Sequence, residues 1–126
     1  MKDLLSTLIF LLAAVAAMQG QPSRDITLSA GKRLAGVVGV SAYQSVPPLR
    51  NTLNDADSIA ATLRFLGFEV MTLRDPNKQQ LDLFLENYFN RLVKGDYEAA
   101  LFYYSGHGIS VSGNNYLAPV DARRNS

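Results

Sequence analysis

The sequence predicts an α/β fold with a parallel β-sheet. Three apolar segments rich in β-branched or aromatic residues alternate with two segments whose apolar residues recur in steps of three and four. This alternation is typical of β-α-β units, in which helices cross over between parallel strands. Two further short runs around a Ser-Gly-Asn-Asn stretch indicate a hairpin. The predicted order is therefore β-α-β-α-β followed by a hairpin.

Residues 33–40, RLAGVVGV, are predicted to form the first strand. The run lacks in/out alternation, which is typical of a strand buried on both faces. Its glycines do not have the spacing of a phosphate-binding loop. After a loop with two prolines, residues 52–66 are predicted to form a helix, capped by Asn51 or Thr52 and stopped by Gly67. The apolar face of this helix is predicted to consist of Leu53, Ala56, Ile59, Ala60, Leu63 and Leu66.

The second half of the chain continues the pattern. Residues 68–73 are predicted to form the second strand, and Asn77 is placed to cap a helix over residues 78–93. Residues 99–104, AALFYY, are predicted to form the third strand. The hairpin is expected to turn at residues 112–115.

The N-terminus has the layout of a secretory signal peptide, which we assign to residues 1–17. A short start with one lysine precedes an apolar stretch of about 14 residues and small residues of the A-x-A type. A spanning helix needs about 20 apolar residues. We therefore expect export to the periplasm or outside the cell, with no stable membrane insertion after cleavage. An uncleaved anchor is the alternative. Residues 18–32 are a lead-in, and residues 33–126 form the domain.

Composition limits the classes of function. The 126 residues include no cysteine and one histidine, and 12 basic residues nearly balance 11 acidic ones. The chain has the length of one domain. It has no disulfides and no zinc cluster, and we expect no cofactor and no metal. No run of like charges suggests binding to nucleic acid.

His107 is the strongest candidate for chemistry. It lies between two glycines at the end of the third predicted strand. Ligands of open α/β sheets bind beyond the carboxyl ends of the strands. If the first strand lies between the other two, this segment converges with the loop and first helical turn over residues 47–57. Histidine titrates near neutral pH, which suits general acid–base catalysis. The alternative is a solvated histidine in a turn.

Asp55 and Ser105 are the next candidates. Asp55 lies in the first turn of the first helix, where an acidic residue pairs favourably with the helix dipole. It could equally be a carboxylate that binds a cationic substrate group. Ser105 is two residues from His107, and neighbours at this spacing seldom reach the roughly 2.6–3.2 Å that a nucleophile–base pair needs. We therefore expect Ser105 to line a pocket and not to act as a nucleophile.

Two stretches, RLAGVVGVSAYQSVPPLRNTLNDADSIAATLRFLGFEV and ALFYYSGHGISVSGNNYLAPVDA, resemble the caspase-like cysteine peptidases. The likeness is to the bacterial relatives of metacaspases and paracaspases, and it covers residues 33–122. It implies a caspase-like three-layer sandwich with a parallel sheet. It also implies proteolysis by a Cys–His dyad, with a polypeptide as substrate. In this family the histidine of SGHG, here His107, belongs to the dyad.

The resemblance also implies roles for other residues. The backbone N–H of Gly108 is a candidate donor to the oxyanion. In the branch specific for Arg or Lys, the acidic residue of NDA and the serine of SGH line the pocket for the basic side chain. These correspond to Asp55 and Ser105, and Thr52 stands at a further pocket position.

The chain departs from the family pattern because it contains no cysteine. The family's cysteine lies in a D-x-C motif at the end of a later strand. We therefore expect the chain to be the N-terminal portion of a longer domain, truncated before the later strands, and a full-length form to have room for further C-terminal domains. The alternative is a catalytically inactive caspase-like interaction domain. A third reading is a small α/β domain that binds a ligand at the same strand ends.

Overall fold

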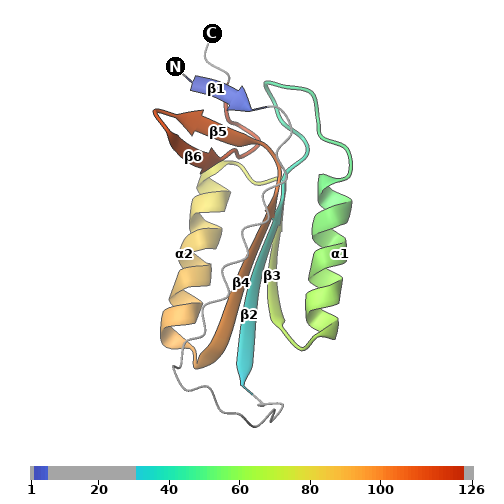
Figure 1. Cartoon of the computed structure of the whole chain (residues 1–126), viewed down its shortest axis with the longest axis vertical. Coiled ribbons are helices and arrows are strands. Elements are labelled where there is room, and N and C mark those ends of the chain that lie inside the picture. The colour runs from blue at the N-terminus through green and yellow to red at the C-terminus, as the bar shows by residue number, and fades with distance from the viewer. Residues whose placement is uncertain (1, 6–30, 124–126) are drawn as a thin grey trace.

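The computed structural model describes residues 2–5 and 31–123 (Figure 1). From residue 32 onward its elements follow the predicted order, whereas the strand over residues 2–5 was not predicted. The predicted strands and helices are confirmed, with boundaries that shift by at most two residues. The elements are β1 (Lys2–Leu5), β2 (Lys32–Gly39), α1 (Thr52–Phe65), β3 (Glu69–Arg74), α2 (Lys78–Lys94), β4 (Tyr97–Ser105), β5 (Gly108–Val111) and β6 (Asn114–Leu117).

The main sheet has the strand order β3-β2-β4, and both pairings are parallel. The first strand predicted from the sequence is therefore the central one, as the convergence of the two candidate segments required. Helix α1 covers one face of the sheet and α2 covers the other, which makes three layers (Figure 1). This arrangement confirms the α/β class and is consistent with a truncated caspase-like sandwich.

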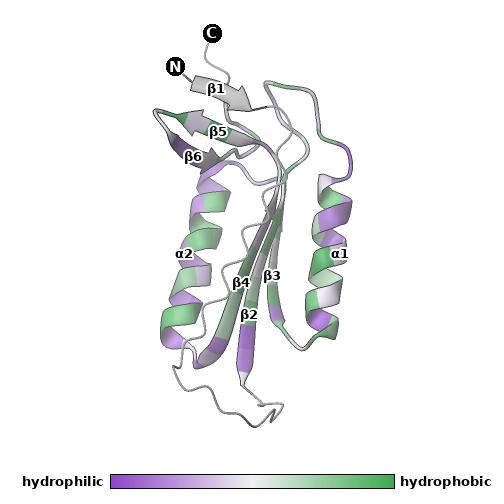
Figure 2. Ribbon diagram, in the orientation of Figure 1, coloured by the Kyte–Doolittle hydropathy of each residue, from purple (hydrophilic) through white to green (hydrophobic). Residues whose placement is uncertain are grey.

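The core lies on both faces of β2, where successive side chains point in opposite directions. Ala35 and Val37 pack in the cluster that includes the buried residues of α1, whereas Val38 packs with residues of α2. Figure 2 shows the apolar residues of both helices and the central strands. A Cβ added at Gly39 would lie 2.8 Å from the Cβ of Ala56. Gly39, the second glycine of the GVVGV run, thus lets α1 pack closely against the strand.

The two helices begin in different ways. Asn77 caps α2 as predicted, because its side chain accepts from the Gln80 N–H and Gln80 bonds back to the Asn77 N–H, forming a capping box. Asn51 is the N-cap residue of α1, one of the two predicted, but the expected side-chain bond is not formed. Asn51 is left-handed, with φ of 63°, and makes no side-chain cap bond. The Thr52 hydroxyl donates instead to the backbone oxygen of Val40 at 3.0 Å.

The end of α1 matches the prediction only in part. Gly67 takes a φ of 88°, a left-handed conformation suited to glycine, and the helix stops before it. Ala56, Ala60 and Leu63 of the predicted apolar face are buried, but Leu66 is 52% exposed. Leu66 lies one residue beyond the helix, so the helical spacing no longer directs its side chain to the sheet.

A second, smaller sheet has the order β1-β5-β6, with antiparallel pairing throughout. The β5–β6 turn consists of two residues with positive φ, Ser112 and Gly113, and is tighter than predicted. Strand β1 comes from the predicted signal peptide, whose remaining residues lie outside the described part of the chain, as does most of the lead-in. Within residues 2–5 and 31–123, no helix is long and apolar enough to cross a membrane.

Candidate active site

His107 lies in the connection between β4 and β5, at the carboxyl edge of the main sheet. Only 6% of the residue is exposed, so the alternative of a solvated turn histidine is wrong. Its ring packs against the ring of Tyr43, with centroids 4.6 Å apart and planes tilted by 56°. The packing partner therefore comes from the loop that follows β2 and not from the glycines beside the histidine.

Two tyrosine hydroxyls bind the backbone of this segment. The His107 N–H donates to the Tyr43 hydroxyl at 2.7 Å, and the Tyr104 hydroxyl donates to the His107 carbonyl at 2.6 Å. Burial raises the pKa of both phenols, so they remain protonated donors at neutral pH. A Cβ at Gly106 would lie 2.5 Å from the Tyr104 hydroxyl and 2.7 Å from that of Tyr43. Gly106 is thus required by the close approach of the tyrosines.

Ser105 and Thr52 meet at the same end of β2. Ser105 lies opposite Gly39 in the register and is fully buried. The Val40 N–H donates to the Ser105 carbonyl at 2.8 Å, and the Thr52 hydroxyl donates to the Val40 carbonyl at 3.0 Å. The peptide groups on the two sides of Val40 therefore connect Ser105 to Thr52 at this strand end.

The Ser105 hydroxyl makes no hydrogen bond of normal geometry, although its oxygen is buried. Its polar neighbour is the Tyr103 hydroxyl. Burial is the main cause that raises the pKa of Tyr103; the Ser105 hydroxyl lowers that pKa, and the negative charge of Asp55 raises it. Ser105 and the charge of Asp55 therefore both act on the pKa of this phenol. Asp55 is partly exposed, in the first turn of α1.

The backbone N–H of Gly108 points away from the β5–β6 hairpin. The Ala118 N–H donates to the His107 carbonyl at 3.1 Å, which makes this a hydrogen-bonded pair of the antiparallel ladder. Because such pairs alternate, the next pair, Gly108 and Leu117, directs its N–H groups outward. That outer edge of β5 is where β1 pairs, with Leu5 opposite Gly108.

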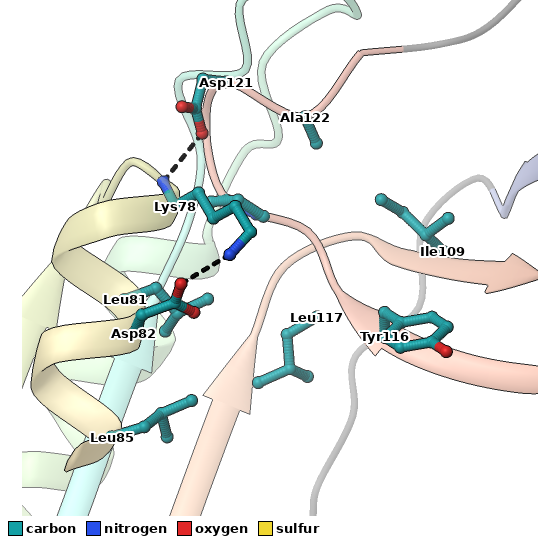
Figure 3. A pocket seen from close by; sticks show the side chains of 10 residues that line it. Lys78, Leu81, Asp82, Leu85, Ile109, Tyr116, Leu117, Asp121 and Ala122 are labelled. Carbon is teal, nitrogen blue, oxygen red and sulfur yellow. Dashed lines mark hydrogen bonds and ion pairs between the residues drawn. The ribbon is translucent and has the colours of Figure 1, made fainter.

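A separate groove of about 560 Å³ lies between α2 and the hairpin (Figure 3). Its apolar wall includes Leu81 and Leu117, and its charged rim contains an ion pair of 2.6 Å between Lys78 and Asp82. None of the five predicted site residues lines it. Within the described residues, no group of three His, Cys, Asp or Glu side chains could hold a metal ion.

Sequence reasoning missed Tyr43 and Tyr104 as part of the site. Tyr104 is indistinguishable from its neighbours in an apolar strand, and Tyr43 lies in a loop without periodicity. The available signal was Gly106, since a glycine at a strand end often marks the close approach of another group. That signal shows a need for space but does not identify the group that fills it.

Comparison with known proteins shows the family of the chain. Residues 32–126 match the caspase domain family. The chain is 33% identical over 90 residues to human (Homo sapiens) mucosa-associated lymphoid tissue lymphoma translocation protein 1 and, equally, to the mouse (Mus musculus) homolog. Each match covers 71% of this chain and 11% of the relative, so the chain spans about a tenth of the length of these curated relatives. The family match covers well over half of the chain, and the chain therefore belongs to the caspase domain family.

Proposed function

We propose that this chain supplies the histidine half of a cysteine-type endopeptidase site. The observation that carries the proposal is the convergence of His107, Ser105 and the start of α1 at one sheet edge in a chain of the caspase domain family. The 126 residues contain no cysteine, so the nucleophile would come from a cysteine outside them. The reaction is the hydrolysis of a peptide bond in a polypeptide substrate.

The chemistry assigned to His107 is proton transfer. The imidazole takes the thiol proton, and the thiolate attacks the peptide carbonyl carbon, forming a C–S bond while the carbonyl electron pair moves to oxygen. The outward N–H of Gly108 is suited to stabilise that oxyanion. The oxyanion then re-forms the carbonyl as the C–N bond breaks, and the imidazolium donates its proton to the leaving amine. Water, deprotonated by the same histidine, attacks the thioester, the C–S bond breaks, and the proton returns to the thiolate.

Specificity for Arg or Lys is proposed to come from Asp55 and Ser105. A carboxylate at the mouth of a pocket attracts a cationic side chain, and Arg can bind it through two hydrogen bonds. The Ser105 oxygen is buried without a normal hydrogen bond. Unsatisfied buried groups are rare, and a guanidinium or ammonium donor would satisfy this one. The hydroxyl of Thr52 already donates to Val40, so Thr52 would shape the wall and leave the contact with substrate to the other two.

The outer edge of β5 supports a polypeptide substrate. It already carries one extended segment, β1, which pairs antiparallel over four residues starting at Gly108. An edge that accepts one strand can accept another in the same hydrogen-bonding pattern. We further propose that the chain is exported and that cleavage of residues 1–17 would remove β1 and expose this edge.

The absence of cysteine favours a second candidate, a catalytically inactive caspase-like interaction domain. In that case the β5 edge would bind a partner strand without cleaving it. The two functions differ in one observable property, which is turnover of a peptide by a form that carries the family's cysteine.

The test begins with the coding sequence beyond Ser126. An in-frame strand followed by D-x-C supports the peptidase, and the longer protein should then cleave fluorogenic peptides after Arg or Lys. His107→Ala should abolish that cleavage, whereas Asp55→Asn should mainly raise KM for basic peptides. The exposed Ser45 offers a matched control, Ser45→Ala, with unchanged activity. Turnover that survives in His107→Ala would refute the dyad. A stop codon without such a motif would refute the peptidase and favour the inactive interaction domain.

A further inference from the structure

The backbone of His107 is held by an unusual set of hydrogen bonds, which we call the tyrosine rung. It consists of the backbone groups of His107 and Ala118 and the hydroxyls of Tyr43 and Tyr104. Ala118 and His107 lie opposite each other just beyond the β5–β6 ladder. A hydrogen-bonded antiparallel pair normally exchanges two N–H···O bonds. Here the Ala118 N–H donates directly to the His107 carbonyl at 3.1 Å, but the His107 N–H donates to the Tyr43 hydroxyl at 2.7 Å. The Tyr43 hydroxyl in turn donates to the Ala118 carbonyl at 2.9 Å.

The protons of the two phenols can be assigned from the distances. Each hydroxyl has one proton to donate. The Tyr104 proton goes to the His107 carbonyl at 2.6 Å, which is closer than the Ala118 carbonyl at 3.1 Å. The Tyr43 proton goes to Ala118, leaving its lone pair free to accept from His107. The N–H and carbonyl groups of His107 and Ala118 then all have hydrogen-bond partners. The Tyr43 hydroxyl takes the place of a direct bond from the His107 N–H to the Ala118 carbonyl.

We infer that Tyr43 is a positioning residue that sets the place of the His107 imidazole, with Tyr104 as its weaker partner. Tyr43 fixes the histidine twice, through the bond to its N–H and through the ring contact at 4.6 Å. The residue comes from the loop after β2, so it ties that loop to the histidine segment across 64 positions of sequence. Gly106 makes the insertion possible, because a Cβ there would collide with both hydroxyls.

The two tyrosines differ in what their loss would leave behind. Without the Tyr43 hydroxyl, the buried His107 N–H loses its acceptor, and an unsatisfied buried donor is costly. Without the Tyr104 hydroxyl, the His107 carbonyl keeps its bond from Ala118. Tyr43→Phe should therefore disturb the histidine more than Tyr104→Phe, although both keep the aromatic ring. The role in catalysis rests on the proposed function, but the positioning itself does not.

The test uses NMR on the full chain, where the single histidine gives an unambiguous imidazole signal. Wild type should show a protected His107 amide and one sharp set of imidazole resonances. Tyr43→Phe should speed exchange of that amide by about tenfold or more and shift or broaden the imidazole signals. Tyr104→Phe should change both less. Tyr116→Phe is the matched control, because Tyr116 is 53% exposed on the same hairpin.

An unprotected His107 amide in wild type, or a Tyr43→Phe variant that resembles Tyr116→Phe, overturns the inference. If Tyr43→Phe does not fold, wild type decides: the ring contact at 4.6 Å should give nuclear Overhauser effects between the Tyr43 ring and the imidazole, and their absence overturns the inference. These readouts need no cysteine, so they stand apart from the proposed peptidase. In a longer form with the cysteine, Tyr43→Phe should lower kcat while leaving KM unchanged, whereas a purely structural role would lower only the amount of folded protein.

Discussion

Replacing Ser105 with alanine should stabilise the free domain. The residue is fully buried, and its hydroxyl makes no hydrogen bond of normal geometry. Burying a hydroxyl without a partner costs about 1–3 kcal/mol. Alanine keeps the Cβ and removes only the oxygen, so the change creates no clash and little empty space. We expect the free energy of unfolding to rise by about 1–2 kcal/mol.

Thr52→Val should have the opposite effect at the same strand end. The Thr52 residue is 5% exposed, and its hydroxyl donates to the Val40 carbonyl at 3.0 Å. Valine has nearly the same shape, so the substitution removes the bond and leaves the packing intact. The buried carbonyl loses this donor, and the free energy of unfolding should fall by about 1–2 kcal/mol.

Urea unfolding of the full chain, followed by circular dichroism, measures both effects. With a slope of about 2 kcal/mol per molar urea, Ser105→Ala should raise the midpoint by about 0.5–1 M. Thr52→Val should lower the midpoint by a similar amount. Ser45→Ala, an exposed control, should stay within about 0.5 kcal/mol of wild type. A lower midpoint for Ser105→Ala would mean that the hydroxyl is already bonded in the free protein, and the argument that it awaits a substrate donor would fail.

Three further outcomes are expected. Gly39→Ala should destabilise the domain by about 1–3 kcal/mol in the same urea assay, because its Cβ would lie 2.8 Å from that of Ala56; an unchanged midpoint would contradict this. The Tyr97 hydroxyl donates to Glu69 at 2.6 Å and is the main cause that lowers the pKa of that carboxyl. Because the pKa is lowered on folding, the stabilisation is present above the ordinary pKa of glutamate and is lost as pH falls through the lowered one; Tyr97→Phe should raise the pKa in a carbon-13 titration. Removing β1 should speed exchange of the Gly108 amide, which points to the edge that β1 occupies, and a rate equal to that of the full chain would contradict this assignment.

The order of elements could be predicted from the sequence because its signals are local. Helical spacing, a glycine stop at Gly67 and the cap at Asn77 each depend on a few neighbouring residues, and the structure confirms them. The side-chain cap bond predicted for α1 is absent because Asn51 adopts a left-handed conformation, and the Thr52 hydroxyl bonds to the carbonyl of Val40, 12 residues earlier and just beyond β2. Local rules cannot anticipate which distant carbonyl competes for a hydroxyl.

The site was predictable in its location but not in its contacts. The alternation of strands and helices was enough to place His107 at the carboxyl edge of the sheet, where open α/β sheets generally bind ligands. The contact that buries its ring comes from Tyr43, in a loop that the two prolines mark only as irregular. The pairing of β1 with β5 joins residues about a hundred positions apart and has no counterpart in any sequence pattern.

The histidine is held in place without any contribution from a nucleophile. Its backbone bonds come from Tyr43, Tyr104 and Ala118, all within the described residues, and its ring is packed by Tyr43. If His107 has the proposed catalytic role, a group held before the substrate arrives avoids the loss of conformational freedom at the moment of reaction. A cysteine brought to this edge would meet an imidazole whose ring already packs against Tyr43. On this argument the hydrogen bonds of Tyr43 and Tyr104 to the His107 backbone should be insensitive to the cysteine, and protection of the His107 amide should be the same in a longer form that carries the cysteine and in that form with the cysteine replaced by alanine.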